Sequence, residues 1–372
     1  MNYRRLAVLV AGAAVVVAAC TGGATPSPSA APSEAPSEAP SAAPSETACV
    51  VGVSWNNYQE ERWAKWDEPA LKAAIEAGGG SYISNDAKSS AETQATNVEN
   101  LISQGANVVI ILAQDGTAIK PSVASAISQG VPVIAYDRLI EDPGALYITF
   151  DNKLVGKMEA EAVLNVVDSG NFVIIKGNSA DANADFLREG YVEAGIPPVG
   201  ESSDKIKIVG ESYTDNWDPA IAQTSMEQFL AANNNEVDAV LSENDGMAGG
   251  VIAALEAQGL AGKVPVSGQD GDQAALNRVA LGTQTVSVWK DARELGTAAG
   301  EAAIALCGNP DVKSVPGVVQ FTTPGGNDMT SIFLQPIPLG KDNLNLVVEA
   351  GWIDKATLCQ GVTDTASVPA CQ

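Results

Sequence analysis

The sequence predicts an α/β fold made of two doubly wound domains with a cleft between them. Three features support this prediction: apolar strand-like segments alternate with helical ones, the alternation restarts after residues 147–150, and polar or aromatic residues follow the strands. Such alternation is typical of βαβ units, whose crossover helices cover a parallel sheet. Two sheets whose strand ends face one another would enclose a small-molecule site.

The segment Val131–Arg138 shows the pattern most clearly, because an apolar run stops abruptly at an acid and a base. A mostly β-branched run without polar alternation is typical of a parallel strand buried on both faces. Asp137 and Arg138 would then emerge at the carboxyl end of the strand, where open α/β sheets bind ligands. A carboxylate beside a guanidinium suits the vicinal hydroxyls of a sugar. A structural ion pair in a loop is the alternative explanation.

The first half of the folded region contains three predicted helices between its strands. We expect strands at 49–55, 82–85, 107–113, 131–136 and 147–150 and helices at 60–77, 91–104 and 119–129. Ser89 and Glu92 form a capping-box signature at the start of the second helix.

The second half continues the same alternation. We expect helices at 153–167, 183–193, 219–231, 246–258, 272–280 and 292–306 and strands at 172–176, 205–212, 238–243, 264–268 and 283–289. The tail from residue 315 has strand-like runs at 318–322 and 331–334. We assign 49–150 and 290–332 to the N-terminal lobe and 151–289 and 333–372 to the C-terminal lobe.

The start of the chain predicts export and lipid attachment. Residues 1–20 have a basic start, an apolar run too short to span a membrane, and the small-residue ending Val-Ala-Ala-Cys. This ending resembles the lipobox of bacterial lipoproteins, which implies a signal peptide cleaved before Cys20 and a lipid on its sulfur. Residues 21–48 repeat the unit Ala-Pro-Ser-Glu, which is typical of an extended tether.

Composition excludes several classes of function. The formal net charge of −24 argues against a nucleic-acid partner, which needs a basic surface, and against direct contact with anionic lipid. The chain has no histidine and therefore lacks the commonest general base and the commonest metal ligand. We expect no metal and no cofactor.

Four cysteines remain after lipid attachment: Cys49, Cys307, Cys359 and Cys371. In an exported protein an even number favours one or two disulfides, and the absence of Cys-x-x-Cys argues against zinc or redox motifs. The sequence leaves the pairing open. Cys49 with Cys371, beside the two ends of the folded region, and Cys307 with Cys359 form one natural pairing.

Five motifs connect the chain with a known family. They are Glu-Arg-Trp at 61–63, Ala-Tyr-Asp-Arg-Leu-Ile at 135–140, Tyr-Ile-Thr-Phe-Asp-Asn at 147–152, Asn-Asp-Gly-Met-Ala-Gly-Gly at 244–250 and Ser-Gly-Gln-Asp at 267–270. In these motifs the chain resembles the bacterial D-xylose-binding protein family, type I periplasmic sugar-binding proteins of ABC importers. The resemblance implies two Rossmann-like domains joined by three hinge strands and closing on a pyranose.

Position by position, the resemblance also implies a ring of ligand-binding residues. They are Arg62, Trp63, Asp137, Arg138, Asn183, Trp217, Asn244, Asp270 and Lys290. A pyranose has an apolar face and a belt of hydroxyls, which two aromatic planes and several polar groups complement. Large aromatics mostly pack in cores, but the charged neighbours of Trp63 and Trp217 favour the edge of a cleft. The loop 55–60 departs from the family pattern, so contacts from it stay open.

The sequence therefore predicts a non-enzymatic substrate-binding lipoprotein that binds a monosaccharide, D-xylose, and delivers it to the membrane subunits of an ABC permease. We expect a monomer on the outer face of the cell membrane, held there only by its lipid. The alternatives are another aldose (glucose, galactose or arabinose), a sugar sensor for a chemoreceptor or kinase, and a retaining glycosidase with Asp137 and Asp270 as paired carboxylates. Arg138 argues against the glycosidase, because it would keep Asp137 ionised.

Overall fold

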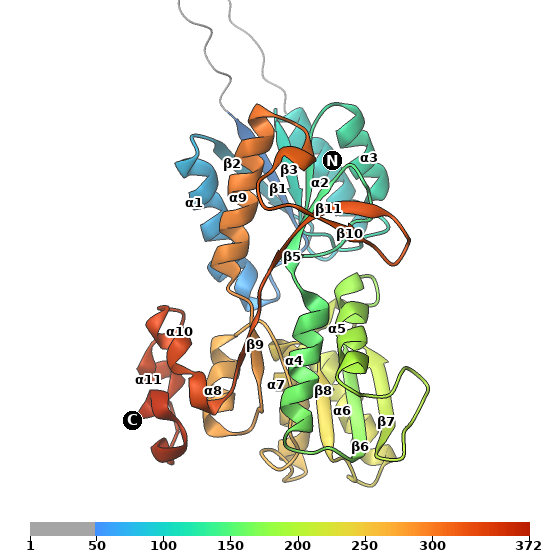
Figure 1. Ribbon diagram of the computed structural model, residues 1–372, viewed down its shortest axis with the longest axis vertical. Helices are drawn as coiled ribbons and strands as arrows, with labels where there is room; N and C mark the ends of the chain where they lie inside the picture. Colours follow the sequence, from blue (N-terminus) through green and yellow to red (C-terminus); the bar gives the residue numbers. More distant parts are fainter. Residues whose placement is uncertain (1–48) are drawn as a thin grey trace, which may run out of the picture. The chain divides into compact units, whose positions relative to one another are not determined.

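A seven-stranded sheet lies at the centre of one lobe of the computed structural model, and a three-stranded sheet lies at the centre of the other (Figure 1). The structure describes residues 49–372. The predicted signal peptide at 1–20, the tether at 21–48 and the lipid site Cys20 lie outside this range. None of the helices within it has both the length and the apolar character that crossing a bilayer requires.

The N-terminal lobe is built on the seven-stranded sheet. In spatial order its strands are β10 (Val319–Thr322), β11 (Asp328–Leu334), β5 (Leu146–Phe150), β4 (Val133–Tyr136), β3 (Val108–Ile111), β1 (Val50–Trp55) and β2 (Ser81–Asp86). All neighbouring strands are parallel except β10 and β11. The central strands β3, β4 and β5 are buried along their whole length, which explains their continuous apolar runs.

Helices cover both faces of this sheet. On one face α1 (Glu68–Ala77) and α9 (Ala292–Gly308) pack over Val51, Val53 and their neighbours. On the other face α2 (Ala91–Ser103) and α3 (Lys120–Ser128) pack over Val109 and Ile111. Ser90 caps α2 by accepting a hydrogen bond from the Thr93 amide at 3.1 Å, so the cap lies one residue after the serine of the predicted capping box.

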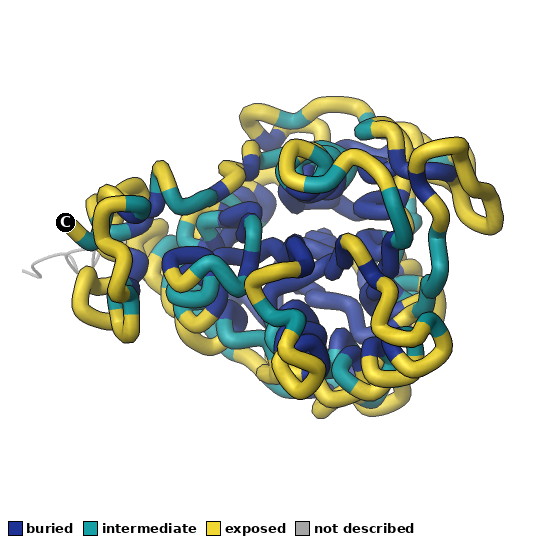
Figure 2. Tube along the Cα trace, turned by 90° about the horizontal axis from the view of Figure 1, so that it is seen from below, coloured by how far each residue is buried: buried dark blue, intermediate teal, exposed yellow. Residues whose placement is uncertain are grey.

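The C-terminal lobe is built on the sheet β7-β6-β8. These strands are β6 (Gly170–Lys176), β7 (Ile206–Tyr213) and β8 (Ala239–Ser242), and the helices around them are α4 (Asn152–Leu164), α5 (Ala182–Glu193), α6 (Pro219–Ala232), α7 (Asp245–Ala257) and α8 (Gln273–Leu281). Helices form at every position where the sequence predicted one. Figure 2 shows the buried segments in the interior, with exposed loops around them.

The predicted strand at 264–268 is wrong, because the structure has only isolated bridges there, such as the one from Val240 to Val266. Part of the backbone ladder forms, because the Val240 amide donates to the Pro265 carbonyl at 2.9 Å and the Ser267 amide donates to the Val240 carbonyl at 3.2 Å. Side chains interrupt it: the Ser242 amide donates to Ser267 Oγ at 3.0 Å, and the Val266 amide donates to Thr285 Oγ1 at 3.1 Å. Pro265 has no amide hydrogen to offer. The predicted strand at 283–289 shortens to β9 (Ser287–Trp289), which pairs with β12 (Ile337–Leu339).

The chain passes between the lobes three times. It leaves the N-terminal lobe between β5 and α4, returns between β9 and α9, and leaves again between β11 and β12 (Figure 1). Three parallel connections allow the lobes to rotate about the crossing segments while each lobe keeps its own core. The fold therefore has the hinge and the interdomain cleft that the sequence predicted.

After β12 the chain forms a small segment, residues 340–372, beside α8, with the short helices α10 (Asn345–Glu349) and α11 (Lys355–Leu358). A disulfide between Cys359 and Cys371 closes this segment, and a second disulfide joins Cys49 to Cys307. The pairing suggested by position along the chain is therefore wrong. The end of α9 lies beside the start of β1, which brings Cys307 to Cys49, and this proximity exists only in the folded chain.

Two carboxyl groups lie in the core of the C-terminal lobe. Glu159 of α4 accepts a hydrogen bond from the Tyr191 hydroxyl, and Glu243, at the end of β8, accepts one from the Gly177 amide at 2.6 Å. Both side chains are fully buried, and within residues 49–372 the second oxygen of each has no hydrogen-bond partner. Burial raises the pKa of Glu159 and of Glu243 well above the usual value for a glutamate.

We expect the protein to become less stable as the pH rises from about 5 to about 8. A carboxyl group whose pKa is raised by folding binds more protons in the native state than in the unfolded state, so its contribution is full below the unfolded pKa and is lost as the pH rises towards the folded pKa. Thermal unfolding across this pH range measures the effect. The double variant Glu159→Gln/Glu243→Gln should show a flatter slope and higher stability at the alkaline end. A slope equal to that of the wild type would contradict this account.

Candidate functional site

One cavity between the lobes is lined by all nine residues that the sequence singled out, together with three others. The N-terminal lobe contributes Glu60, Arg62, Trp63, Asp137 and Arg138, and the C-terminal lobe contributes Asp181, Asn183, Trp217, Asn244, Gln269 and Asp270. Lys290 lies where the chain crosses from β9 to α9. The space left between them is about 20 Å³, which is room for about one water molecule. The side chains therefore close on one another in this structure.

Arg62 and Trp63 lie where the chain enters α1. The predicted helix 60–77 begins there as a π-helical turn, Trp63–Asp67, in which the Glu68 amide donates to the carbonyl of Trp63. Pro69 follows and lacks the amide hydrogen that a regular α-helical bond would need. Single π turns are frequent at functional sites, and this one brings Asp67 back beside Arg62.

Arg62 is buried and is held by three carboxylates. Its Nε and Nη2 donate to Asp67 at 3.0 and 2.9 Å, and its Nη1 lies 3.3 Å from both Asp137 and Asp270. The Tyr136 hydroxyl also donates to Asp67. Burial raises the pKa of Asp67 to about 6 against the opposing charge of Arg62. Asp67 thus orients the guanidinium towards the cavity.

Arg138 joins the two lobes. Its Nη2 lies 3.0 Å from Glu60 and its Nε lies 2.9 Å from Asp181, which caps α5 in the C-terminal lobe. Glu60 also accepts a hydrogen bond from Trp63 Nε1 at 2.7 Å. Asp137 and Arg138, the acid and the base at the end of β4, therefore do not form an ion pair with each other. They point to different partners across the cavity.

Asp137 has a left-handed backbone, with φ of 61°, an uncommon conformation for a residue other than glycine. Thr149 Oγ1 donates to its carbonyl at 2.8 Å, and Asn183 Nδ2 donates to the same carbonyl at 3.1 Å. Asn183 thereby connects α5 with the end of β4. Strain of this kind is found where a binding group must be aimed.

Asp270 lies at the opposite side of the cavity with φ of 101°. Lys290 Nζ lies 3.0 Å from its carboxylate and Arg62 Nη1 lies 3.3 Å from the same oxygen. Although burial raises the pKa of Asp270, the charges of Lys290 and Arg62 outweigh this effect and hold the pKa below its usual range. A carboxyl group in this state accepts hydrogen bonds and is unsuited to act as a general acid.

Asn244 and Trp217 come from the starts of two helices. Asn244 Oδ1 accepts a hydrogen bond from the Met247 amide at 2.8 Å and so caps α7, which leaves its NH₂ group for other partners. Trp217 precedes α6, has φ of 56° and belongs partly to the lobe core. A Cβ atom at Gly177 would lie 2.2 Å from the Trp217 ring, so only glycine lets the ring take this place.

Several buried polar atoms around the cavity have no hydrogen-bond partner within residues 49–372. They are Gln269 Oε1 and Trp217 Nε1, and Asp137 Oδ2 has only its ion pair with Arg62 at 3.3 Å. Buried polar groups are nearly always satisfied, so these atoms are suited to a polar ligand. Direct contacts across the cleft, such as Gln114 Nε2 to Asn216 Oδ1 at 2.8 Å, hold the lobes together. A ligand larger than water needs these lobes to separate first.

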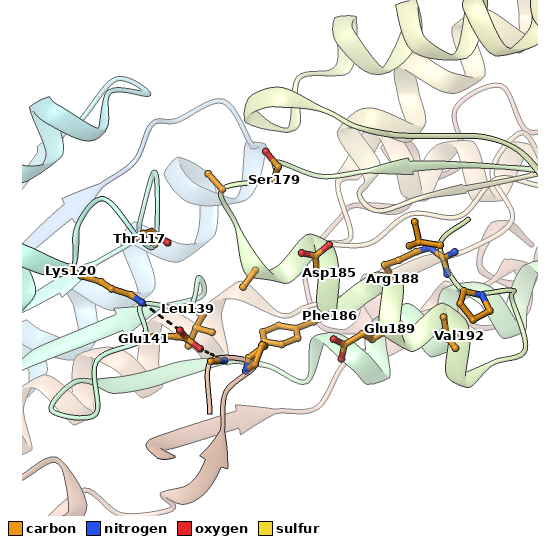
Figure 3. A pocket seen from close by; sticks show the side chains of 17 residues that line it. Thr117, Lys120, Leu139, Glu141, Ser179, Asp185, Phe186, Arg188, Glu189 and Val192 are labelled. Carbon is orange, nitrogen blue, oxygen red and sulfur yellow. Dashed lines mark hydrogen bonds and ion pairs between the residues drawn. The ribbon is translucent and has the colours of Figure 1, made fainter. Parts of the chain in front are cut away.

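A larger hollow of about 600 Å³ also lies between the lobes (Figure 3), and its wall contains none of the twelve cavity residues. Its charged side chains are already paired: Lys120 with Glu141 at 3.4 Å, and Arg188 with Glu211 at 3.0 Å. It contains one aromatic ring, Phe186. Arg188 Nη1 has no hydrogen-bond partner within residues 49–372, but no second aromatic plane faces the first, so the smaller cavity is the stronger candidate for the site.

Sequence reasoning missed four residues of this arrangement. Glu60, Asp181 and Gln269 line the cavity, and Asp67 orients Arg62 behind it. Gln269 and Asp181 each lie within two residues of a predicted site residue, and this closeness was an available signal. Glu60 lies in the loop that departs from the family pattern, and no periodicity pointed to Asp67.

Comparisons with known proteins agree with this geometry. Residues 51–310 match the family model described as a periplasmic binding protein domain. The chain is 37% identical to the D-xylose-binding periplasmic protein of Escherichia coli, over 83% of this chain and 92% of that protein, and 34% identical to that of Haemophilus influenzae, over 83% and 91%.

A solved carbohydrate transporter solute-binding protein from Chloroflexus aurantiacus, in complex with D-glucose, superimposes with a TM-score of 0.74 at 27% identity, covering 82% of this chain and 97% of that one. The predicted resemblance and fold class are thereby confirmed, as is the expectation of a binding protein rather than an enzyme. The chain belongs to the periplasmic binding protein family, as an ABC transporter solute-binding protein of the monosaccharide-binding type I group.

Proposed function

We propose that this chain binds one molecule of D-xylose in the cavity between its lobes and delivers it to the membrane subunits of an ABC permease. The observation that carries the proposal is the composition of the cavity wall. Two tryptophans, four carboxylates, three cations and three amides converge from both lobes. Few ligands other than a small polyol or sugar offer both an apolar face and many hydroxyls to such a wall.

Each class of side chain has a partner on a sugar. Carboxylates such as Asp137 and Asp270 accept hydrogen bonds from hydroxyls, cations such as Arg62 and Lys290 donate to ring and hydroxyl oxygens, and the amides do both. Charge-assisted hydrogen bonds of this kind are about twice as strong as neutral ones. The rings of Trp63 and Trp217 offer apolar planes to the C–H face.

The choice of D-xylose rests on the two relatives that are named for it and are at least 34% identical to this chain. The D-glucose complex of the Chloroflexus protein, at 27% identity, supports an aldohexose as the alternative. A pentose and a hexose differ by one hydroxymethyl group, and a group of this size is worth only ~1–3 kcal/mol in a pocket. Arabinose and galactose therefore belong in the same test.

Closure of the lobes belongs to the proposed mechanism. Arg62 pairs with Asp270, and Arg138 pairs with Asp181, across the cleft at 3.3 and 2.9 Å. A bound sugar would insert its hydroxyls among these groups and so connect both lobes through itself. Because an open form can make only half of these contacts, the ligand would favour the closed form.

Isothermal titration calorimetry of residues 49–372 with xylose, arabinose, ribose, glucose and galactose tests the proposal. We expect one-to-one binding, strongest with xylose. A stronger response to glucose would move the assignment to the hexose alternative. No heat with any of the sugars, from a protein that unfolds cooperatively, would refute it.

We expect Asp270→Asn to weaken sugar binding by about 10- to 100-fold. The change keeps the shape of the side chain, but it removes a charged acceptor, and each charge-assisted hydrogen bond contributes ~1.5–3 kcal/mol. Asp215→Asn is the matched control, since Asp215 is exposed and lies two residues before Trp217 outside the cavity wall. Equal affinities of the two variants would exclude Asp270 from the site.

We also propose that Cys20 carries the lipid that holds the protein at the outer face of the cell membrane. The Val-Ala-Ala-Cys ending and the repeated Ala-Pro-Ser-Glu units of 21–48 support this placement. Changing Cys20→Ala should move the protein from the membrane fraction to the soluble fraction of the producing cells. Retention of the variant in membranes, as for the wild type, would contradict lipid attachment at this residue.

A further inference from the structure

The turn Asp270–Asp272 carries a charged cavity residue in a backbone conformation that it would not adopt unaided. Asp270 has φ of 101°, and Gly271 after it has φ of 80°. A left-handed residue other than glycine persists only when its surroundings hold it in place. The contacts around this turn therefore determine where the Asp270 carboxylate lies.

One set of contacts comes from α7. Asp245 Oδ2 accepts hydrogen bonds from the amides of Gly271 and Asp272, both at 3.0 Å. Ser287 Oγ donates to the same oxygen at 2.6 Å, and Gln284 Nε2 donates to the other oxygen at 2.7 Å. Asp245 thus fixes the amide groups of the turn, and Ser287 and Gln284 in turn hold the Asp245 carboxylate in place.

The carbonyl side of the turn is held by the C-terminal segment. Trp352 Nε1 donates to the Gly271 carbonyl at 2.6 Å, and Gln273 Nε2 donates back to the Trp352 carbonyl at 2.7 Å. Trp352 is 1% exposed. Its side chain does not line the cavity, so any effect on a ligand must pass through the turn.

Trp352 also touches the other lobe. Its ring stacks on Trp66 with centroids 4.4 Å apart and an angle of 19° between the planes. Trp66 belongs to the π-helical turn Trp63–Asp67, next to Arg62. Trp352 therefore contacts the two backbone turns that carry Arg62 and Asp270, the two partners of an ion pair across the cleft.

We propose that Trp352 is a positioning residue for the ligand site, and that it makes the C-terminal segment 340–372 a working part of that site. The inference rests on the proposed sugar-binding function of Asp270 and extends it. The indole N–H fixes the Gly271 carbonyl, and with it the direction of the Asp270 carboxylate. The stacking of Trp352 on Trp66 keeps the turn Asp270–Asp272 at a fixed position relative to Arg62 when the lobes are closed.

A double-mutant cycle between Trp352→Phe and Asp270→Asn tests the inference. We expect Trp352→Phe, which keeps an aromatic ring and removes the N–H donor, to weaken sugar binding about 3- to 10-fold, the range expected from one hydrogen bond. In the Asp270→Asn background the same change should have no further effect, because the group that it positions is already altered. If Trp352 only stabilised the fold, its substitution would lower the unfolding temperature. The coupling energy between the two substitutions in sugar binding would then be zero.

Trp289→Phe is the matched control. Trp289 packs beside Trp352 in the same cluster, with ring centroids 5.5 Å apart, but within residues 49–372 its Nε1 has no hydrogen-bond partner. We expect Trp289→Phe to leave the sugar affinity within about twofold of the wild type. Gln273→Ala is a milder second variant, which loosens Trp352 without removing it, and should weaken binding in the same non-additive way.

The outcomes separate the two proposals. A wild type that binds no sugar refutes the proposed function. A wild type that binds, together with Trp352→Phe and Gln273→Ala variants that bind equally well, overturns the positioning role alone. Losses that add fully to that of Asp270→Asn also overturn it, since Trp352 would then act elsewhere. The positioning role is supported if Trp352→Phe weakens sugar binding in the wild-type protein but not in the Asp270→Asn variant. If Trp352→Phe does not fold, the same result with Gln273→Ala supports it.

Discussion

The buried guanidinium of Arg62 is the constraint on which the arrangement of the lobes depends. Its side chain is 1% exposed, and a buried cation is tolerated only when carboxylates and hydrogen bonds compensate its lost hydration. One carboxylate comes from its own turn, one from the end of β4 and one from the opposite lobe. Full compensation of this charge therefore requires the lobes to be closed.

The same constraint explains how the proposed site for a neutral sugar can be so highly charged. Arg62, Arg138 and Lys290 are matched by Asp137, Asp181, Glu60 and Asp270 within one cavity wall. The pairs within one lobe, such as Arg138 with Glu60 and Arg62 with Asp137, keep these side chains in a defined orientation before a ligand arrives, which lowers the entropic cost of binding. A sugar hydroxyl both donates and accepts, so it can enter between an acid and a base without leaving either one unsatisfied.

Much of the fold could be predicted because it depends on local patterns. Buried parallel strands such as Val108–Ile111 need continuous apolar runs, and helices such as α2 need a cap and a periodic face, so both leave a signature in the sequence. The strand predicted at 264–268 is reduced to isolated bridges for a local reason that the pattern hides: the side chains of Ser267 and Thr285 accept two of the amide hydrogens, so only part of the backbone ladder forms. An apolar run alone does not reveal which atoms take the hydrogen bonds.

Of the candidate site, the sequence by itself determined the residue types and the strand ends from which they emerge, because strand ends and family motifs are local features of the chain. Only the tertiary structure decided which acid meets which base. Asp137 lies next to Arg138 in sequence but pairs with Arg62, and Arg138 reaches Glu60 and Asp181 instead. The disulfides and the contact of Trp352 with Gly271 were decided in the same way. Such pairs are set by distances between segments far apart along the chain, and these distances exist only after both lobes have folded and closed.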